Sequence, residues 1–157
     1  MFQTPPDSQQ NQKIPFSFDQ ELTQEQALHL YPKTGILILL SPPKQIELGI
    51  DNISWRICDR FKGFKLIPVG PHYIHYALKD ENYQYRLGFF IQSTAGQVII
   101  KEWSEDTSTF IDVQDTDKIN TYISCAKNLE LDGYLAPYPN NKYHLWNDSS
   151  NYINQAI

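Results

Sequence analysis

The sequence predicts a mainly β domain: an antiparallel β-sandwich-like fold with a short N-terminal helix and one helix near the C-terminus. The clearest evidence is the segment 83–92, in which aromatic and aliphatic residues occupy every second position, a period that fits a strand and not a helix. Further runs of β-branched and aromatic residues are bounded by Gly, Pro and Ser. Helical periodicity is confined to segments near 19–31 and 117–131.

Length and charge narrow the class of protein. A chain of 157 residues forms one domain and buries roughly 70% of its unfolded surface, so it needs no disulfide or metal for stability. The net charge of −5 disfavours broad affinity for nucleic acid or anionic membranes. No apolar run approaches the roughly 20 residues that cross a bilayer, and the first residues lack the pattern of a signal peptide, so we expect an intracellular protein.

Three regions are expected along the chain. Residues 1–15 are rich in Gln, Asn and Pro and are expected to form a disordered tail. The folded domain is expected over 16–146, followed by a polar C-terminal end at 147–157.

The N-terminal half of the domain begins with a helix and a strand. The helix is expected within 19–31, with Thr23 and Gln26 as a capping pair and Pro32 near its end. The run Ile36–Leu40 is apolar at every position, which predicts a strand that is buried on both faces.

Strands are also expected at 71–78, 83–92 and 97–103, after a turn at 67–70. Because residues 93–96 have the composition of a turn, the last two strands are expected to form an antiparallel hairpin.

The C-terminal part is expected to be less regular. Residues 102–117 carry six acidic side chains and no Lys or Arg, and we interpret them as a solvated loop that places negative charge at the start of a helix. That helix is expected over 117–131, with Asp132-Gly133 as its stop. The prolines in 135–139 exclude both regular helix and central strand.

The residues that could support catalysis or metal binding do not form a recognisable site. His72 and His75 are three residues apart, so on a strand they point to opposite faces and cannot chelate one ion. Cys58 and Cys125 are interpreted as ordinary thiols, and Asp51 with Glu47 is a weak candidate for an acid–base pair. There is no Gly-x-Ser-x-Gly elbow and no glycine-rich phosphate loop. The sequence thus predicts no enzyme, no catalytic residue, no cofactor and no metal.

A block from Gly49 to Tyr76 combines aromatic, glycine and basic residues. Its cations are Arg56, Arg60, Lys62 and Lys65. Two interpretations stand side by side. The block is a docking surface, since aromatic residues and Arg dominate binding hot spots, or its aromatic residues belong to the core and the charges surround them.

A set of motif residues follows in order along the chain: Gly49, Asp51, Trp55, Phe61, Gly63, Pro68, Gly70, His72, Gly88, Phe89, Trp103, Pro137, Tyr138 and Pro139. This ordered set resembles the Aar-two splicing-factor family, specifically its N-terminal domain. The sequence departs from the family pattern at Cys58-Asp59, Pro68-Val69 and Ala136. Family members continue into a large helical domain, so this chain is either a fragment or a shortened homologue.

The resemblance implies a function. Family members are non-enzymatic assembly factors of the U-five small nuclear ribonucleoprotein, active in mRNA splicing. They bind the RNase-H-like and Jab/MPN-like domains of the largest spliceosomal scaffold protein and keep the helicase off it. The resemblance therefore implies a protein partner, with no direct nucleic acid and no membrane, in the cytoplasm and nucleus. It does not identify the contact residues, for which we select the four cations of the block.

Two other classes of function remain open. The chain could be a sandwich module that binds a small molecule or glycan through Tyr73, Tyr83, Tyr85 and Tyr138. An enzyme could be based only on His72, His75 and nearby carboxylates.

Overall fold

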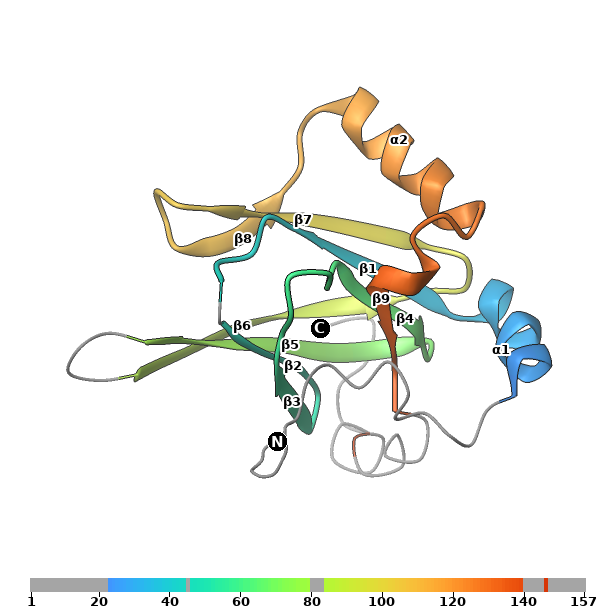
Figure 1. The fold of residues 1–157 in the computed structure, drawn as a ribbon, viewed down its shortest axis with the longest axis horizontal. Helices are drawn as coiled ribbons and strands as arrows, with labels where there is room; N and C mark the ends of the chain where they lie inside the picture. The colour runs from blue at the N-terminus through green and yellow to red at the C-terminus, as the bar shows by residue number, and fades with distance from the viewer. Residues whose placement is uncertain (1–22, 45, 80–83, 140–145, 147–157) are drawn as a thin grey trace.

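The computed structural model describes residues 23–44, 46–79, 84–139 and 146. Its elements are α1 (Gln24–Leu30), η1 (Tyr31–Lys33), β1 (Gly35–Leu40), β2 (Glu47–Ile50), β3 (Ile53–Arg56), β4 (Gly63–Ile67), β5 (Gly70–Lys79), β6 (Gln84–Ser93), β7 (Val98–Ser104), β8 (Thr109–Asp112), α2 (Thr116–Lys127), η2 (Asp132–Tyr134) and β9 (Leu135–Pro137) (Figure 1). The segments 1–15 and 147–157, expected as a tail and a polar end, lie outside the described residues.

Two sheets form the body of the domain. One has the strand order β8-β7-β1-β4-β9 and the other the order β3-β2-β5-β6. Most neighbouring strands are antiparallel, while β1 runs parallel to β7 and β4 parallel to β9. The predicted mainly β class, with one short helix before the strands and one helix near the C-terminus, is confirmed.

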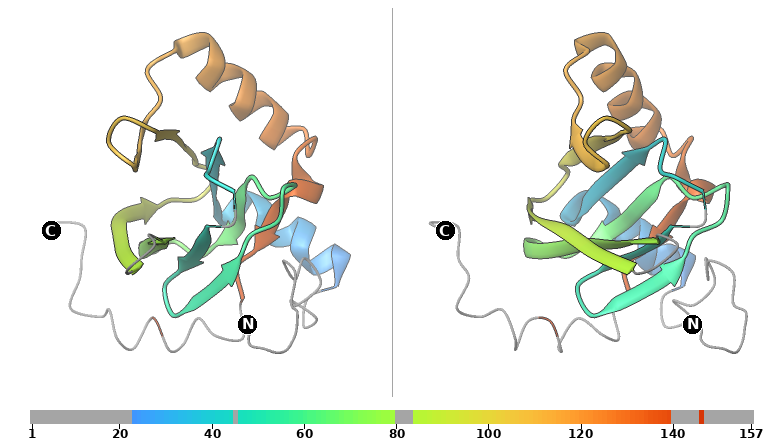
Figure 2. Two further views of the ribbon diagram at one scale, coloured as in Figure 1. Left: turned by 60° about the vertical axis from the view of Figure 1, so that its left-hand side comes forward. Right: turned by 90° about the vertical axis from the view of Figure 1, so that its left-hand side faces the viewer.

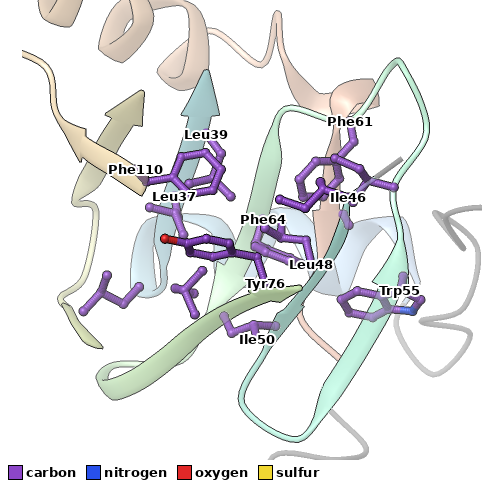
Figure 3. Packing of buried hydrophobic residues seen from close by; sticks show 14 of the residues in the cluster. Leu37, Leu39, Ile46, Leu48, Ile50, Trp55, Phe61, Phe64, Tyr76 and Phe110 are labelled. Carbon is purple, nitrogen blue, oxygen red and sulfur yellow. The ribbon is translucent and has the colours of Figure 1, made fainter. Parts of the chain in front are cut away.

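Strand β1 is buried on both faces, as its unbroken apolar sequence predicts. Leu37 and Leu39 point into the core between the sheets, together with residues from both of them (Figure 3). Ile36 and Ile38 contribute to a second cluster that includes Ala126 of α2. Helix α2 therefore covers the outer face of the five-stranded sheet (Figure 2).

The predicted hairpin between residues 83–92 and 97–103 is wrong. β6 pairs with β5 in one sheet, whereas β7 pairs with β1 and β8 in the other. The intervening turn is held against the start of β1, because Gly96 N–H donates to the Thr34 carbonyl and Ile36 N–H to that of Gln97. A strand that is apolar on both faces belongs inside a sheet and needs a partner at each edge, and β7 supplies one of them.

The helix α1 confirms the predicted capping pair. The Thr23 hydroxyl accepts from the Gln26 backbone N–H at 3.1 Å, and the Gln26 side chain accepts from the Thr23 N–H at 2.9 Å. This capping box satisfies two N–H groups that a helix end leaves free.

The acidic segment is only partly a loop. Residues 102–104 belong to β7 and residues 109–112 to β8, where Asp112 forms an ion pair with Lys101 at 2.7 Å. The expected negative charge at the helix start is confirmed, since Asp115 caps α2 by accepting from the N–H groups of Asp117 and Lys118.

Helix α2 ends earlier than predicted, at Lys127 and not near Leu131. The chain reverses at Leu129, which has a φ of +64°. Leu129 N–H donates to the Ala126 carbonyl and Glu130 N–H to that of Cys125, the bonding pattern that usually places glycine at the reversal.

The proline-containing segment after α2 forms β9, a short edge strand beside β4. An edge position tolerates proline because one side of the strand needs no sheet partner. This agrees with the prediction that the segment is neither helix nor central strand. Among the described residues, no helix is long and apolar enough to span a membrane.

Candidate functional site

The motif residue Asp51 is the centre of a buried polar network. It follows β2 with a φ of +56°, which turns the chain toward β3. One carboxylate oxygen accepts from the Tyr73 backbone N–H at 2.8 Å, and the other from the Tyr138 hydroxyl at 2.6 Å. The second oxygen also lies 2.5 Å from Nδ1 of His72. Asp51 thus connects the β2–β3 turn, β5 and the segment after β9.

His72 is completely buried, with 0% of its surface exposed. Its Nε2 lies 2.7 Å from the carbonyl oxygen of Pro68, while Nδ1 faces the Asp51 carboxylate. Each ring nitrogen of His72 thus faces an oxygen atom that can accept a hydrogen bond. Trp146 stacks on the ring and donates to the Pro71 carbonyl at 2.6 Å. This network ties segments of the fold together and leaves His72 no access to a substrate.

His75 points to the other face of β5 and is half-buried. Its Nε2 lies 2.9 Å from the Asp51 carbonyl, to which it donates. Burial lowers the pKa of His75, and the positive charge of Arg86 adds to that effect. The motif glycine Gly49 provides room for this ring, because a Cβ there would collide with it.

In the structure, the two histidines that were considered for catalysis or metal binding have structural roles. His72 and His75 do not converge, in agreement with their spacing on a strand. In the described part of the chain, no group of three or more His, Cys, Asp and Glu side chains could hold a metal ion.

Three of the four selected cations gather around η2. We call Arg60, Lys62 and Lys65 the η2 cationic patch. The Arg60 guanidinium lies 5.5 Å from the centre of the Tyr134 ring and Lys62 Nζ lies 5.8 Å from it. Lys65 Nζ forms an ion pair with Asp132 at 2.7 Å. The β3–β4 connection is held there because Lys62 N–H donates to the Tyr134 carbonyl at 2.8 Å.

The cations of the patch differ in availability. The Lys65 side chain is only 16% exposed and forms an ion pair with Asp132. Arg60 is exposed, and Lys62 is half-buried. Arg56 is not part of the patch: it lies on β3, in the other sheet, opposite Glu47. Of the four cations selected from the sequence, three thus lie together around η2, and Arg56 lies apart from them on β3.

A cavity of about 460 Å³ adjoins the η2 cationic patch, and Lys62 belongs to both. It lies between the loop after β1 and the β3–β4 connection. Its lining consists of Leu39, Ser41, Pro42, Pro43, Lys44, Ile57, Cys58, Asp59, Phe61 and Lys62. Sequence reasoning missed both Lys44 and Tyr134, since nothing local indicates that these residues join the block.

The aromatic residues of the block belong to the core, as the structural interpretation predicts. Trp55 and Phe61 are each 3% exposed, and Phe64 is fully buried between them. Their rings pack at centroid distances of 5.7 Å and 5.2 Å from that of Phe64. These three rings are therefore not available at the surface as contacts for a partner.

The remaining motif residues also serve the fold. Gly63 lies against the Leu37 carbonyl, and Gly70 opens β5 with a φ of +129°. Gly88 faces the Tyr73 ring. Phe89 and Trp103 pack around the same ring, that of Phe110.

The C-terminal motif is buried as well. Pro137, Tyr138 and Pro139 all lie in the interior, and Tyr138 is 1% exposed. Tyr138 cannot stack on a glycan from this position. Tyr73 is half-buried, and the side chains of Tyr83 and Tyr85 lie outside the described part.

These features define a β-sandwich domain in which an ordered motif is used for packing and a cationic patch lies on the surface. Compared with known families, residues 33–157 match the AAR2 N-terminal domain. The chain belongs to the AAR2 family, and the resemblance noted from its motif is confirmed.

Several curated relatives are similar over most of this chain. A Caenorhabditis elegans protein described as an AAR2 homolog is 34% identical over 126 residues, covering 80% of this chain and 34% of the relative. The human AAR2 homolog is 29% identical over 140 residues, covering 87% of this chain and 36% of the relative. The mouse AAR2 homolog is 27% identical over the same length. The chain therefore spans about a third of the length of these relatives.

Proposed function

We propose that this chain acts in pre-mRNA splicing, as the N-terminal domain of a non-enzymatic assembly factor of the U-five small nuclear ribonucleoprotein. Its partner is the largest scaffold protein of that particle, bound through the scaffold's RNase-H-like and Jab/MPN-like domains. While bound, it blocks premature binding of the helicase. It would work in the cytoplasm and the nucleus.

The observation that carries this proposal is membership of the AAR2 family over residues 33–157. The arrangement of the motif is consistent with it. Asp51 and His72, which could have served a catalytic centre, are joined with Tyr138 in a buried network. Competition for a surface requires complementary shape and charge and needs no reactive group.

The η2 cationic patch is the contact surface that we propose for the scaffold. Because the chain has a net charge of −5, an acidic partner would be attracted to this local group of cations and repelled by much of the remaining surface. Arg60 and Lys62 are the side chains to test, because Arg60 is the exposed member of the patch and Lys62 also lines the adjoining cavity. Arg56 is a second, separate candidate on β3.

The test is binding of the purified chain to the C-terminal domains of the scaffold, measured by calorimetry. The double variant Arg60→Glu/Lys62→Glu should bind at least about tenfold more weakly, because two attractive charges become repulsive. The variant Arg56→Glu is measured in parallel. Weaker binding would place Arg56 in the contact surface, and unchanged binding would exclude it.

A matched control is Lys33→Glu/Lys127→Glu, which changes the net charge equally at surface positions near α1 and the end of α2. The control should bind like the parent chain. No binding by a chain whose circular dichroism shows it folded would reject the proposed function, provided that a full-length relative binds under the same conditions. If all variants bind equally well, the scaffold remains the partner, but the η2 cationic patch is not the contact surface.

The blocking step has its own test. Adding the chain to the scaffold domains before the helicase should reduce helicase binding, and the patch variant should reduce it less. If helicase binding is unchanged at a saturating concentration of the chain, the proposed blocking role is contradicted. Imaging of the tagged chain in both compartments checks the proposed location.

A further inference from the structure

The cavity beside the η2 cationic patch has a mixed lining. Buried side chains of Leu39, Ile57 and Phe61 form part of it. Pro42 and Pro43, both half-buried, come from the loop after β1. A volume of about 460 Å³ exceeds the space of one side chain and lies in the range of about 300–1,000 Å³ that is typical of ligand sites.

The charges of the cavity favour an anionic occupant. Lys44 and Lys62 reach it from two separate segments, and Asp59 is the acidic residue of its lining. Arg60 stands next to Lys62 over the Tyr134 ring, so a further cation lies just outside. On a chain with a net charge of −5, this local excess of cations is the property that an acidic occupant would recognise.

The kind of occupant follows from the lining. Proline rings and the apolar side chains below them offer contact to a hydrocarbon stem, while the lysines offer charge-assisted hydrogen bonds to a carboxylate. A nucleic acid is disfavoured because the whole chain is acidic and the described lining of the cavity offers only two lysines to a phosphate backbone.

We propose that this cavity is the docking site for a short acidic segment of the protein partner, with carboxylate side chains at Lys44 and Lys62. The inference rests on the proposed function, because it specifies which part of the partner the chain holds. The segment enters between the loop after β1 and the β3–β4 connection. Its carboxylates meet the two lysines, and its apolar stems lie on Pro42 and Pro43.

The cavity contains its own reporter, the half-buried thiol of Cys58. In a Cys125→Ser background, alkylation by iodoacetamide followed by mass spectrometry measures access to this one thiol. The probe is a synthetic peptide of alternating glutamate and leucine, with acetylated and amidated ends. A peptide of the same length with glutamine in place of glutamate is the matched control.

The glutamate peptide should slow alkylation of Cys58 by about fivefold when it is present at about four times its Kd. The Lys44→Glu/Lys62→Glu variant should lose this protection, whereas Lys33→Glu/Lys127→Glu should keep it. Equal protection by the glutamine peptide, or by inorganic phosphate at the same concentration, would overturn the proposal. Absence of protection in the folded parent chain would overturn it as well.

The scaffold domains then separate this inference from the proposed function. If the scaffold binds and protects Cys58 in the parent chain but not in the Lys44→Glu/Lys62→Glu variant, both are supported. If the scaffold binds without protecting Cys58, the cavity assignment fails and the function stands. If the peptide protects Cys58 but the scaffold does not bind, the function fails and the cavity remains a site for acidic segments.

Discussion

At the scale of single residues, one carboxylate organises three separate segments. Asp51 accepts hydrogen bonds from a backbone N–H, a histidine and a tyrosine hydroxyl, and only 8% of its surface is exposed. Each donor satisfies a buried charge that would otherwise be costly. The motif residues Asp51, His72 and Tyr138 are therefore buried partners of one another.

Replacing Tyr138 by Phe tests this network. The ring remains and only the hydroxyl that donates to Asp51 is lost, so the free energy of unfolding should fall by about 1.5–3 kcal/mol. Urea denaturation measures the change. The control Tyr134→Phe, at a ring that is 36% exposed, should change it by less than about 0.5 kcal/mol. Similar values for both variants would contradict the role of the network.

His75 predicts a dependence of stability on pH. Burial lowers its pKa below the ordinary value of 6.5, and the hydrogen bond to the Asp51 carbonyl only partly opposes this. As the pH falls through 6.5, the unfolded chain takes up the proton first, so the folded state loses stability until His75 itself is protonated. His75→Gln should lessen this loss between neutral and mildly acidic pH. Parallel stability profiles of the two proteins would show that His75 does not contribute.

At the scale of elements, a glycine determines how closely β4 approaches β1. Gly63 has a φ of +148°, and a Cβ there would collide with the Leu37 carbonyl. Backbone strain and overpacking therefore act together at this position. Gly70 differs, because its φ is +129° but a Cβ added there would meet no atom within 4 Å.

The pair Gly63→Ala and Gly70→Ala separates these two effects. Gly63→Ala should lower the free energy of unfolding by about 3–6 kcal/mol, and Gly70→Ala by about 1–3 kcal/mol from backbone strain alone. Chemical denaturation of both variants provides the comparison. If Gly70→Ala were the more damaging change, crowding between β1 and β4 would not be the main cause of the lost stability.

The end of α2 offers a stabilising change. Leu129 adopts a left-handed backbone conformation, which costs more conformational free energy for leucine than for glycine. Its side chain is 40% exposed. Leu129→Gly should raise the free energy of unfolding by about 0.5–1 kcal/mol. Thermal denaturation measures it. Leu28→Gly, at an exposed position inside α1, should instead destabilise, and a loss of stability in both variants would refute the argument.

At the scale of the whole molecule, β1 joins two hydrophobic clusters. One of its faces belongs to the core between the sheets and the other to the cluster beneath α2. Neither cluster can lose this strand without exposing apolar side chains of the other. The domain should therefore unfold as one cooperative unit.

Two optical signals check this cooperativity. The far-ultraviolet circular dichroism of the helix and the fluorescence of Trp55 and Trp103, both in the core between the sheets, should change at the same urea concentration. Ile38→Ala should shift both transitions together, because it removes contacts from the α2 side of the shared strand. Loss of the helical signal at lower urea would show that α2 unfolds separately.

The candidate site was only partly predictable. Arg60, Lys62 and Lys65 lie close together in the sequence, so their clustering near one turn could be expected. Their contacts with Asp132 and Tyr134 bridge about 70 residues and have no local signal. Lys44 joins the cavity for the same reason, because the loop after β1 is brought beside the β3–β4 connection only by folding.

The sequence by itself determined where β1, β5, β6 and β7 lie, that α1 is capped at Thr23, and that β1 is buried on both faces. These properties depend on residue spacing and on hydrogen bonds between near neighbours, which the local sequence contains. The tertiary structure alone decided that β6 and β7 enter different sheets, that the chain reverses at Leu129 after α2, and which cations share a cavity. The physical reason is that strand pairing and surface neighbours are selected by burial across the whole chain, where distant segments compete for the same apolar faces.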